Sequence, residues 1–168
     1  ICCIENVNDN ITIKRVKEVE STLQNDFYSC LIVPVLKEQK MDLILQKATE
    51  LGVNESIPYI SKRSVIKLKP DDYKKKVERW TRIVKEASEQ SKRLSIPKVN
   101  KPFTVKELLT LDYDYKILCS VNEMSKSIKT VLSNIKESDR ILVVIGPEGG
   151  FTKEEENRLI EGGFISVS

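Results

Sequence analysis

A short segment near the end of the chain, VVIGPEGGFTKEEE at 143–156, constrains the fold more than any other. The apolar run 141–145 stops at a Gly-Pro-Glu-Gly-Gly turn, and Thr152 and Glu155 beyond it have the spacing of a helix capping box. The segment therefore predicts a strand, a glycine-rich turn and a helix that ends near Gly162. Glycines permit positive φ and also let a ligand approach the main chain, so a turn without a ligand and a ligand-binding turn both remain open. The turn matches neither GxxxxGK(S/T) nor GxGxxG, so a phosphate-binding loop is not indicated.

Apolar runs and amphipathic segments alternate along most of the chain. Strands are predicted at 28–36, 56–60, 116–121 and 141–145, and helices at 40–51, 71–94, 125–135 and 153–161. This order is typical of an α/β fold with a mostly parallel sheet and helices on both faces. Ligands of such sheets bind at the carboxyl ends of the strands, where the glycine-rich turn is expected.

The first residues follow a different pattern. Residues 1–6 and 11–19 alternate apolar and polar positions around Asn8-Asp9-Asn10, which predicts a β-hairpin. We expect it to be the end of an antiparallel β-domain, with a boundary near residue 27. The chain begins with Ile rather than Met, and we expect its natural start to lie upstream.

Histidine is absent from all 168 residues. Its absence removes the commonest general base and most transition-metal sites, so no metal is expected. Chemistry must then use Glu, Asp, Lys, Arg, Tyr, the main chain or a bound cofactor. The four cysteines each stand in an apolar, strand-like run without a CxxC spacing, and we expect buried free thiols in a reducing cytoplasm: Cys2, Cys3, Cys30 and Cys119. No apolar run approaches the length of a membrane span.

Positive charge is concentrated in residues 62–98, which hold 13 Lys or Arg against 5 Asp or Glu. Such a block can dock on a polyanion, or it can be a solvated helix face. The candidates for phosphate contacts are Lys62, Lys74, Lys75, Arg79 and Arg82.

Four other polar residues stand near the expected ends of strands and helices. Glu50 precedes the end of its predicted helix, and Arg63 follows the strand 56–60. Gln90 lies beside the apolar stripe of the helix 71–94, with Arg93 one turn on. Each of these positions is commonplace by itself. Together they are expected to surround the same sheet edge as the glycine-rich turn, which favours a functional site.

Five segments carry a resemblance to a known family: KMDLILQKATELGV, IPYISKRSV, RWTRIVKEASEQSKRLSIPKV, ILVVIGPEGGFTKEEE and EGGFISVS. In this order, over residues 31–168, they resemble the bacterial 16S ribosomal RNA (uracil-N3)-methyltransferase family of the SPOUT superfamily. The combination is specific, although IGPEGG-like turns recur in other SPOUT enzymes.

The resemblance implies S-adenosylmethionine-dependent methylation of N3 of one uridine near the 3′ end of the small-subunit RNA. It also implies a cytoplasmic homodimer that binds 16S ribosomal RNA and the small ribosomal subunit. Residues 1–27 would be the remnant of a PUA-like RNA-binding β-domain. Residues 28–168 would be a SPOUT methyltransferase domain with a trefoil knot, incomplete at its C-terminus.

The resemblance further assigns roles to individual residues. The turn would contact the cofactor through its main chain: Ile145, Gly146, Pro147, Glu148, Gly149 and Gly150. N3 of uracil becomes nucleophilic only after it loses its proton, and charge then spreads onto O2 and O4. Arg63 and Arg93 are the candidates to stabilise that charge, Glu50 to take the proton, and Gln90 to bind the uracil edge. The uridine must be unstacked or single-stranded to reach the site.

One departure from the family pattern concerns the last residue. In the family, the strand ending ISVS continues into a Leu-Gly-x-x-Ile-Leu-Arg-x-Glu-Thr-Ala segment that threads the knot and supplies much of the cofactor site and the dimer contact. The sequence stops at Ser168. Two alternatives to the implied function stay open: a non-catalytic RNA-binding or assembly protein that kept the basic helix and lost the cofactor site, and a SPOUT enzyme with another target, such as a ribose 2′-hydroxyl.

Overall fold

The computed structural model describes residues 2–7, 11–17, 27–123 and 126–168. Its elements are β1 (Cys2–Val7), β2 (Ile11–Arg15), β3 (Tyr28–Pro34), α1 (Glu38–Glu50), β4 (Glu55–Ile60), α2 (Pro70–Gln90), β5 (Lys98–Val99), β6 (Phe103–Thr104), α3 (Val105–Leu108), β7 (Tyr115–Cys119), α4 (Ile128–Leu132), β8 (Arg140–Ile145), α5 (Lys153–Glu161) and β9 (Ile165–Val167). Strands β3 to β9 form one sheet in the order β5-β4-β3-β8-β7-β9, and β6 also pairs with β4. All of these pairings are parallel, as predicted.

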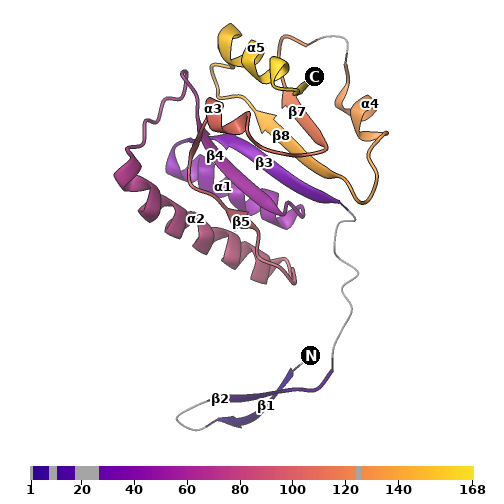
Figure 1. Cartoon of the computed structure of the whole chain (residues 1–168). Helices are drawn as coiled ribbons and strands as arrows, with labels where there is room; N and C mark the ends of the chain where they lie inside the picture. Colours follow the sequence, from indigo (N-terminus) through magenta and orange to yellow (C-terminus); the bar gives the residue numbers. More distant parts are fainter. Residues whose placement is uncertain (1, 8–10, 18–26, 124–125) are drawn as a thin grey trace.

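Helices cover both faces of this sheet, which confirms the α/β prediction (Figure 1). On one face, Met41 and Leu45 of α1 pack with Trp80 and Val84 of α2 against β3. On the same face, α4 packs over β7 and β8. On the other face, α3 and α5 pack over the centre of the sheet, where Leu159 is fully buried. Both faces of the central strands are therefore covered, which explains their nearly continuous apolar runs.

The hairpin prediction is confirmed, since β1 and β2 pair antiparallel, while residues 8–10 of the predicted turn lie outside the described residues. The second strand ends at Arg15 instead of 19. Cys2 and Cys3 are exposed, so the prediction of a buried thiol is wrong for these two. The described chain covers neither face of the hairpin at these positions. Cys30 is buried and Cys119 half-buried, and all four thiols are free.

The ends of two helices are fixed by local backbone geometry. After α1, Gly52 has φ +96°, its N–H donates to Thr49 O, and Val53 N donates to Ala48 O. This is a Schellman motif with glycine in its usual place. The prediction that α2 reaches residue 94 is wrong, because the same motif ends α2 at Gln90.

At the end of α2, Lys92 takes the left-handed conformation, with φ 57°. Lys92 N donates to Glu89 O at 3.3 Å, and Arg93 N donates to Ser88 O at 2.9 Å. A lysine at this position gives no signal in the sequence, whereas glycine would have done so. Leu94 then lies outside the helix and is 71% exposed.

The remaining differences concern short elements. Helix α4 spans only Ile128–Leu132, and residue 125 of the predicted helix lies outside the described residues. The two-residue strands β5 and β6 and the one-turn helix α3 were not predicted, because such short elements give no periodic signal. No helix in the described part of the chain is long and apolar enough to span a membrane.

Candidate functional site: a cavity at the carboxyl edge of the sheet

A cavity of about 690 Å³ lies where β7, β8 and β9 end. Its walls come from these strand ends, from the glycine-rich turn after β8, from α5 and from the loop after β4: Arg63, Cys119, Ser120, Val121, Asn122, Ile145, Gly146, Pro147, Glu148, Gly149, Gly150, Phe151, Glu156, Val167 and Ser168. All six turn residues predicted to contact a cofactor border this cavity. Its volume is in the range of small-molecule sites.

The base of the turn rests on two aromatic rings. Tyr59, fully buried on β4, donates its hydroxyl hydrogen to Ile145 O at 3.0 Å. Phe151 stacks on Tyr59 with ring centroids 6.3 Å apart. A Cβ on Gly146 would lie only 3.0 Å from the Phe151 ring, so the lack of a side chain there permits this packing. The aromatic pair therefore fixes the point at which the chain leaves β8.

The two later glycines of the turn differ from each other. Gly150 has φ +67°, a conformation that costs other residues about 1–2 kcal/mol, and its N–H donates to Pro147 O at 2.8 Å. Gly149 has no positive φ, and a Cβ there would meet the Arg63 side chain at ordinary contact distances of 3.7 and 3.8 Å. Backbone geometry thus requires glycine at 150, whereas at 149 a side chain would fit the folded turn.

Arg63 braces the same turn from the loop after β4. Its Nη1 donates to Gly149 O at 2.7 Å and to Phe151 O at 3.1 Å. Arg63 also borders the cavity. Its Nε and Nη2 groups have no hydrogen-bond partner among the described residues, so they remain available to a ligand.

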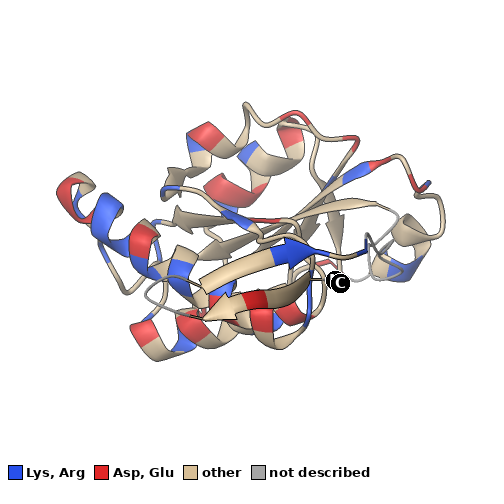
Figure 2. Cartoon of the chain, turned by 90° about the horizontal axis from the view of Figure 1, so that it is seen from below, with Lys and Arg blue, Asp and Glu red and all other residues tan. Residues whose placement is uncertain are grey.

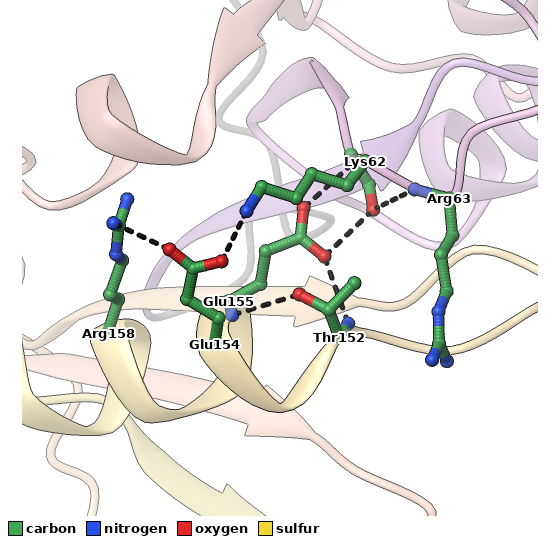
Figure 3. A network of polar contacts seen from close by, with 7 residues as sticks. Lys62, Arg63, Thr152, Glu154, Glu155 and Arg158 are labelled. Atoms are coloured by element: carbon green, nitrogen blue, oxygen red, sulfur yellow. Dashed lines mark hydrogen bonds and ion pairs between the residues drawn. The ribbon is translucent and has the colours of Figure 1, made fainter.

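The loop that carries Arg63 is held by the buried carboxylate of Glu155 (Figure 3). Glu155 accepts hydrogen bonds from Lys62 N at 2.8 Å and Ser61 Oγ at 3.2 Å, and it completes the predicted capping box with Thr152. Burial raises the pKa of Glu155, but the backbone donors outweigh it and leave that pKa below its usual value. The start of α5 and the end of β4 are therefore joined through one ionised side chain.

Glu148 faces the other side of the turn and forms an ion pair with Lys40 of α1. The hydrogen bond from Lys40 lowers the pKa of Glu148. The carboxylate is thus ionised and paired, which fits a residue that holds the turn and not a general acid.

Four polar residues of the cavity were not predicted from the sequence: Ser120, Asn122, Glu156 and Ser168. Ser120 donates its hydroxyl hydrogen to Glu156 Oε1, and Asn122 Nδ2 donates to Glu156 Oε2 at 3.0 Å. The strand was expected to continue to 121, although it ends at Cys119. Residues 120–122 directly follow the carboxyl end of β7, and ligands of parallel sheets bind at that end of the strands. The direction of β7 is therefore the signal that points to these residues.

The prediction that all four polar residues share the edge of the glycine-rich turn is wrong for Glu50, Gln90 and Arg93. Arg93 Nη1 donates to Thr49 O at 2.8 Å and Val53 O at 2.7 Å, just before β4 begins. Helices α1 and α2 return the chain to the amino ends of the strands, so their last turns lie at the opposite edge. Only Arg63 is where the prediction placed it.

The contacts of these three residues agree with structural positions. Arg93 stabilises the last carbonyl groups of α1, where a cation is favourable. Glu50 is hydrogen-bonded by Lys47, which lowers its pKa, whereas a general base profits from a raised one. Gln90 is exposed at the end of α2.

The amino-terminal edge also holds a saturated polar cluster around Glu55, which is 7% exposed. Its carboxylate accepts hydrogen bonds from the hydroxyls of Tyr28 and Tyr113 at 2.9 and 2.8 Å, and from Asn100 at 2.6 Å. Lys98 adds an ion pair at 3.2 Å. Burial, followed by the Glu55 hydrogen bond, raises the pKa of Tyr28 to about 12.

The residues predicted to contact phosphate form two groups. Arg79 is held by Asp42 through two hydrogen bonds of 2.7 and 2.6 Å, and Lys62 is paired with Glu154. Within the described ranges, three others are exposed and make no ion pair: Lys74, Lys75 and Arg82. Blue and red segments follow one another along α2, so the helix is mixed in charge (Figure 2).

Comparison with known proteins agrees with this architecture. The Ribosomal RNA small subunit methyltransferase E of Bacillus subtilis is 40% identical over 131 residues, covering 74% of this chain and 51% of that protein. The protein of the same name from Aquifex aeolicus is 36% identical over 157 residues, covering 94% and 66%. The chain thus spans about half to two thirds of the length of these relatives.

Two solved structures share the fold. A Ribosomal RNA small subunit methyltransferase E from Neisseria gonorrhoeae, bound to S-adenosyl methionine, has a TM-score of 0.75 and 33% identity, covering 88% of this chain and 60% of that one. A putative methyltransferase from Legionella pneumophila in complex with the cofactor SAM has a TM-score of 0.85 and 26% identity, covering 99% and 68%. A family model described as RNA methyltransferase domain matches residues 24–168. The chain therefore belongs to the RNA methyltransferase domain family.

Proposed function

We propose that this chain is the cofactor-binding part of an S-adenosylmethionine-dependent methyltransferase that modifies N3 of a uridine in 16S ribosomal RNA. The observation that carries the proposal is the cavity of about 690 Å³ at the carboxyl edge of the sheet, bordered by all six residues of the glycine-rich turn. The relatives named above, which act on small-subunit ribosomal RNA by name, support the substrate.

The residues present fit this cofactor. The main chain at 145–150 borders the cavity and includes three glycines, so a ligand can approach its polar groups closely, and Val121 and Val167 supply apolar wall. The cavity is large enough for a nucleoside joined to an amino acid. S-adenosylmethionine, when bound, supplies an electrophilic methyl group; the residues of the chain have to position the RNA base and stabilise its charge.

Arg63 is the residue that we propose for charge stabilisation. When N3 of uracil gives its proton to solvent water or hydroxide, negative charge is placed on O2 and O4, and a guanidinium with free N–H groups can hydrogen-bond such oxygens. Arg63 keeps its Nε and Nη2 groups for this purpose while Nη1 stays on the turn. Glu50, Gln90 and Arg93 have no part in this site as it stands within one copy of the chain.

The proposal includes a cytoplasmic homodimer, which the family resemblance implies, and an N-terminal RNA-binding part to which the hairpin β1–β2 belongs. Light scattering on the purified protein tests the dimer. A mass of one chain at micromolar concentration would contradict it.

The experiment that tests the function has two stages. Calorimetry should detect binding of S-adenosylmethionine, and small ribosomal subunits should then take up labelled methyl groups, located by mass spectrometry at N3 of a uridine. Label at a ribose hydroxyl would identify another RNA target, and absence of both binding and label would favour a non-catalytic RNA-binding protein.

A variant at Gly149 connects the binding to the cavity. Gly149→Val should fold, because a Cβ there meets Arg63 only at ordinary contact distances, but its branches add bulk beside Arg63, and both residues border the cavity. We expect the affinity for S-adenosylmethionine to fall about tenfold, roughly 1.4 kcal/mol. Thermal unfolding is the control, and an unchanged affinity in the folded variant would place the cofactor elsewhere.

A further inference from the structure

We propose that Glu156 determines specificity in the cavity by accepting hydrogen bonds from the ribose hydroxyls of the bound nucleoside cofactor. The inference rests on the proposed function, because it assumes that a nucleoside enters this cavity. It concerns a residue that borders the same cavity but is not part of the glycine-rich turn, in the first turn of α5.

The carboxylate of Glu156 is held in one orientation by the loop after β7. Ser120 binds Oε1 and Asn122 binds Oε2 at 3.0 Å, so both oxygens are fixed. Ser120 is itself tied to β9, since its N–H donates to Val167 O at 2.9 Å, and its hydroxyl oxygen accepts from Asn122 N at 3.1 Å. A carboxylate positioned by two side chains that are themselves linked costs little further ordering when a ligand binds.

Glu156 also keeps acceptor capacity. Each carboxylate oxygen has two lone-pair sites, and each receives one hydrogen bond from the described residues. Three charged side chains border the cavity. Glu148 is paired with Lys40, and Arg63 is held by the carbonyls of the turn without an ion pair. Among the described residues Glu156 has no oppositely charged partner, so its remaining lone pairs are offered to whatever occupies the cavity.

The geometry points to a diol as the group that Glu156 binds. Two adjacent hydroxyls match the two oxygens of one carboxylate, which is the pairing that acidic residues use with ribose in dinucleotide-binding sheets. An ammonium group would also pair with Glu156, but its desolvation beside Val121 and Val167 costs more than that of neutral hydroxyls.

The test uses Glu156→Gln in the full chain. Glutamine has the same shape and can still bind Asn122 and Ser120, but it replaces one ligand-facing acceptor by a donor. Calorimetry would compare S-adenosylmethionine with 5′-methylthioadenosine, which keeps the ribose diol and lacks the amino acid. We expect the affinity for both ligands to fall about tenfold. Glu161→Gln, an exposed change on the same helix, should leave both affinities unchanged.

A second comparison isolates the hydroxyl contact. The unmodified protein should bind the 2′-deoxy form of methylthioadenosine about tenfold more weakly than the ribose form, and Glu156→Gln should show little preference between them. A loss confined to S-adenosylmethionine would assign Glu156 to the ammonium group and overturn the inference. Equal affinities in all variants would also overturn it. If the unmodified protein binds none of these ligands, the proposed function itself fails.

Discussion

The two edges of the sheet gather polar side chains from several strands, but they use them differently. At the amino-terminal edge, the carboxylate of Glu55 is bound by four protein groups, and Arg93 donates hydrogen bonds to carbonyls in and just after the last turn of α1. At the carboxyl-terminal edge, Arg63 and Glu156 are only partly used and border a cavity. A cluster of polar residues at strand ends therefore indicates a site only when its hydrogen-bonding groups are left over for a ligand.

The largest effect is expected from removing the centre of the amino-terminal cluster. Glu55→Ala leaves two tyrosine hydroxyls, an amide and an ammonium without their acceptor, so the free energy of unfolding should fall by about 3 kcal/mol. Urea unfolding measures this loss, and the cofactor affinity should stay within about twofold. If the variant were as stable as the unmodified protein, the polar cluster at the amino-terminal edge would not serve stability, and the proposed difference between the two edges would be wrong.

The same cluster should respond to acid. Burial raises the pKa of Glu55, but the hydrogen bonds from Asn100, Tyr113 and Tyr28 outweigh it, so its pKa in the folded state lies below the unfolded value of about 4.3. The stabilisation is therefore complete above about pH 4.3 and is lost as the pH falls through the folded pKa. In Glu55→Ala, this part of the acid dependence should be missing.

The next effect separates the two arginines. Arg93→Met removes the donors to Thr49 O and Val53 O and should lower the free energy of unfolding by about 2 kcal/mol, without a change in cofactor affinity. Arg63→Met should instead lower the single-turnover methylation rate about a hundredfold with a smaller loss of stability. Comparable rate losses in the two variants would show that both edges serve the reaction.

Within the turn, the two neighbouring glycines should differ by about 1 kcal/mol. Gly150→Ala forces a side chain into positive φ and should lower the stability of the protein by that amount. Gly149→Ala meets only ordinary contacts with Arg63 and should leave stability unchanged. Chemical unfolding measures the stability of both variants. Equal losses of stability in the two would mean that the positive φ of Gly150 is not the cause.

The smallest effect on stability is expected on α2, which belongs to neither edge. Lys74→Ala with Lys75→Ala removes two unpaired, exposed charges, so unfolding should not change. If these lysines contact phosphate, the dependence of log RNA affinity on log salt concentration should become shallower by about one to two units. Arg79→Ala is the matched control, because that cation is already held by Asp42. If the salt dependence of RNA affinity is unchanged in the double variant, Lys74 and Lys75 do not contact phosphate and this face of α2 is only solvated.

The sequence was informative where both partners of an interaction lie within one turn. Thr152 and Glu155 predicted the start of α5 to the residue, because a capping box is local. The end of α2 could not be predicted, since Lys92 adopts positive φ without being glycine. The long-range contacts of Glu155 with the loop after β4 were equally invisible, because a helix-start glutamate gives the same pattern whether or not a distant loop binds it.

The misplacement of Arg93 and Glu50 has a different cause. Their positions followed from topology: a helix that connects two parallel strands brings the chain back to the amino edge, so its last turn cannot border the carboxyl edge. The place of the glycine-rich turn follows from the direction of its strand, whereas the polarity of a residue does not say at which edge it lies. Chain direction is therefore the better guide to the edge at which a residue lies.

The pairing of β3 with β8 sets an order on folding. Tyr28, the first residue of the sheet, lies opposite Arg140 in the register, and β3 has β4 on its other side. During synthesis, β3, α1, β4 and α2 emerge first, with one side of β3 still lacking its neighbour. Pairing between strands that are distant in sequence slows folding, and the unpaired edge of β3 can meanwhile pair with strands of other chains. A ribosome that pauses before residue 140 would therefore hold a half-sheet exposed to aggregation, and fast translation of the second half should raise the yield of native protein.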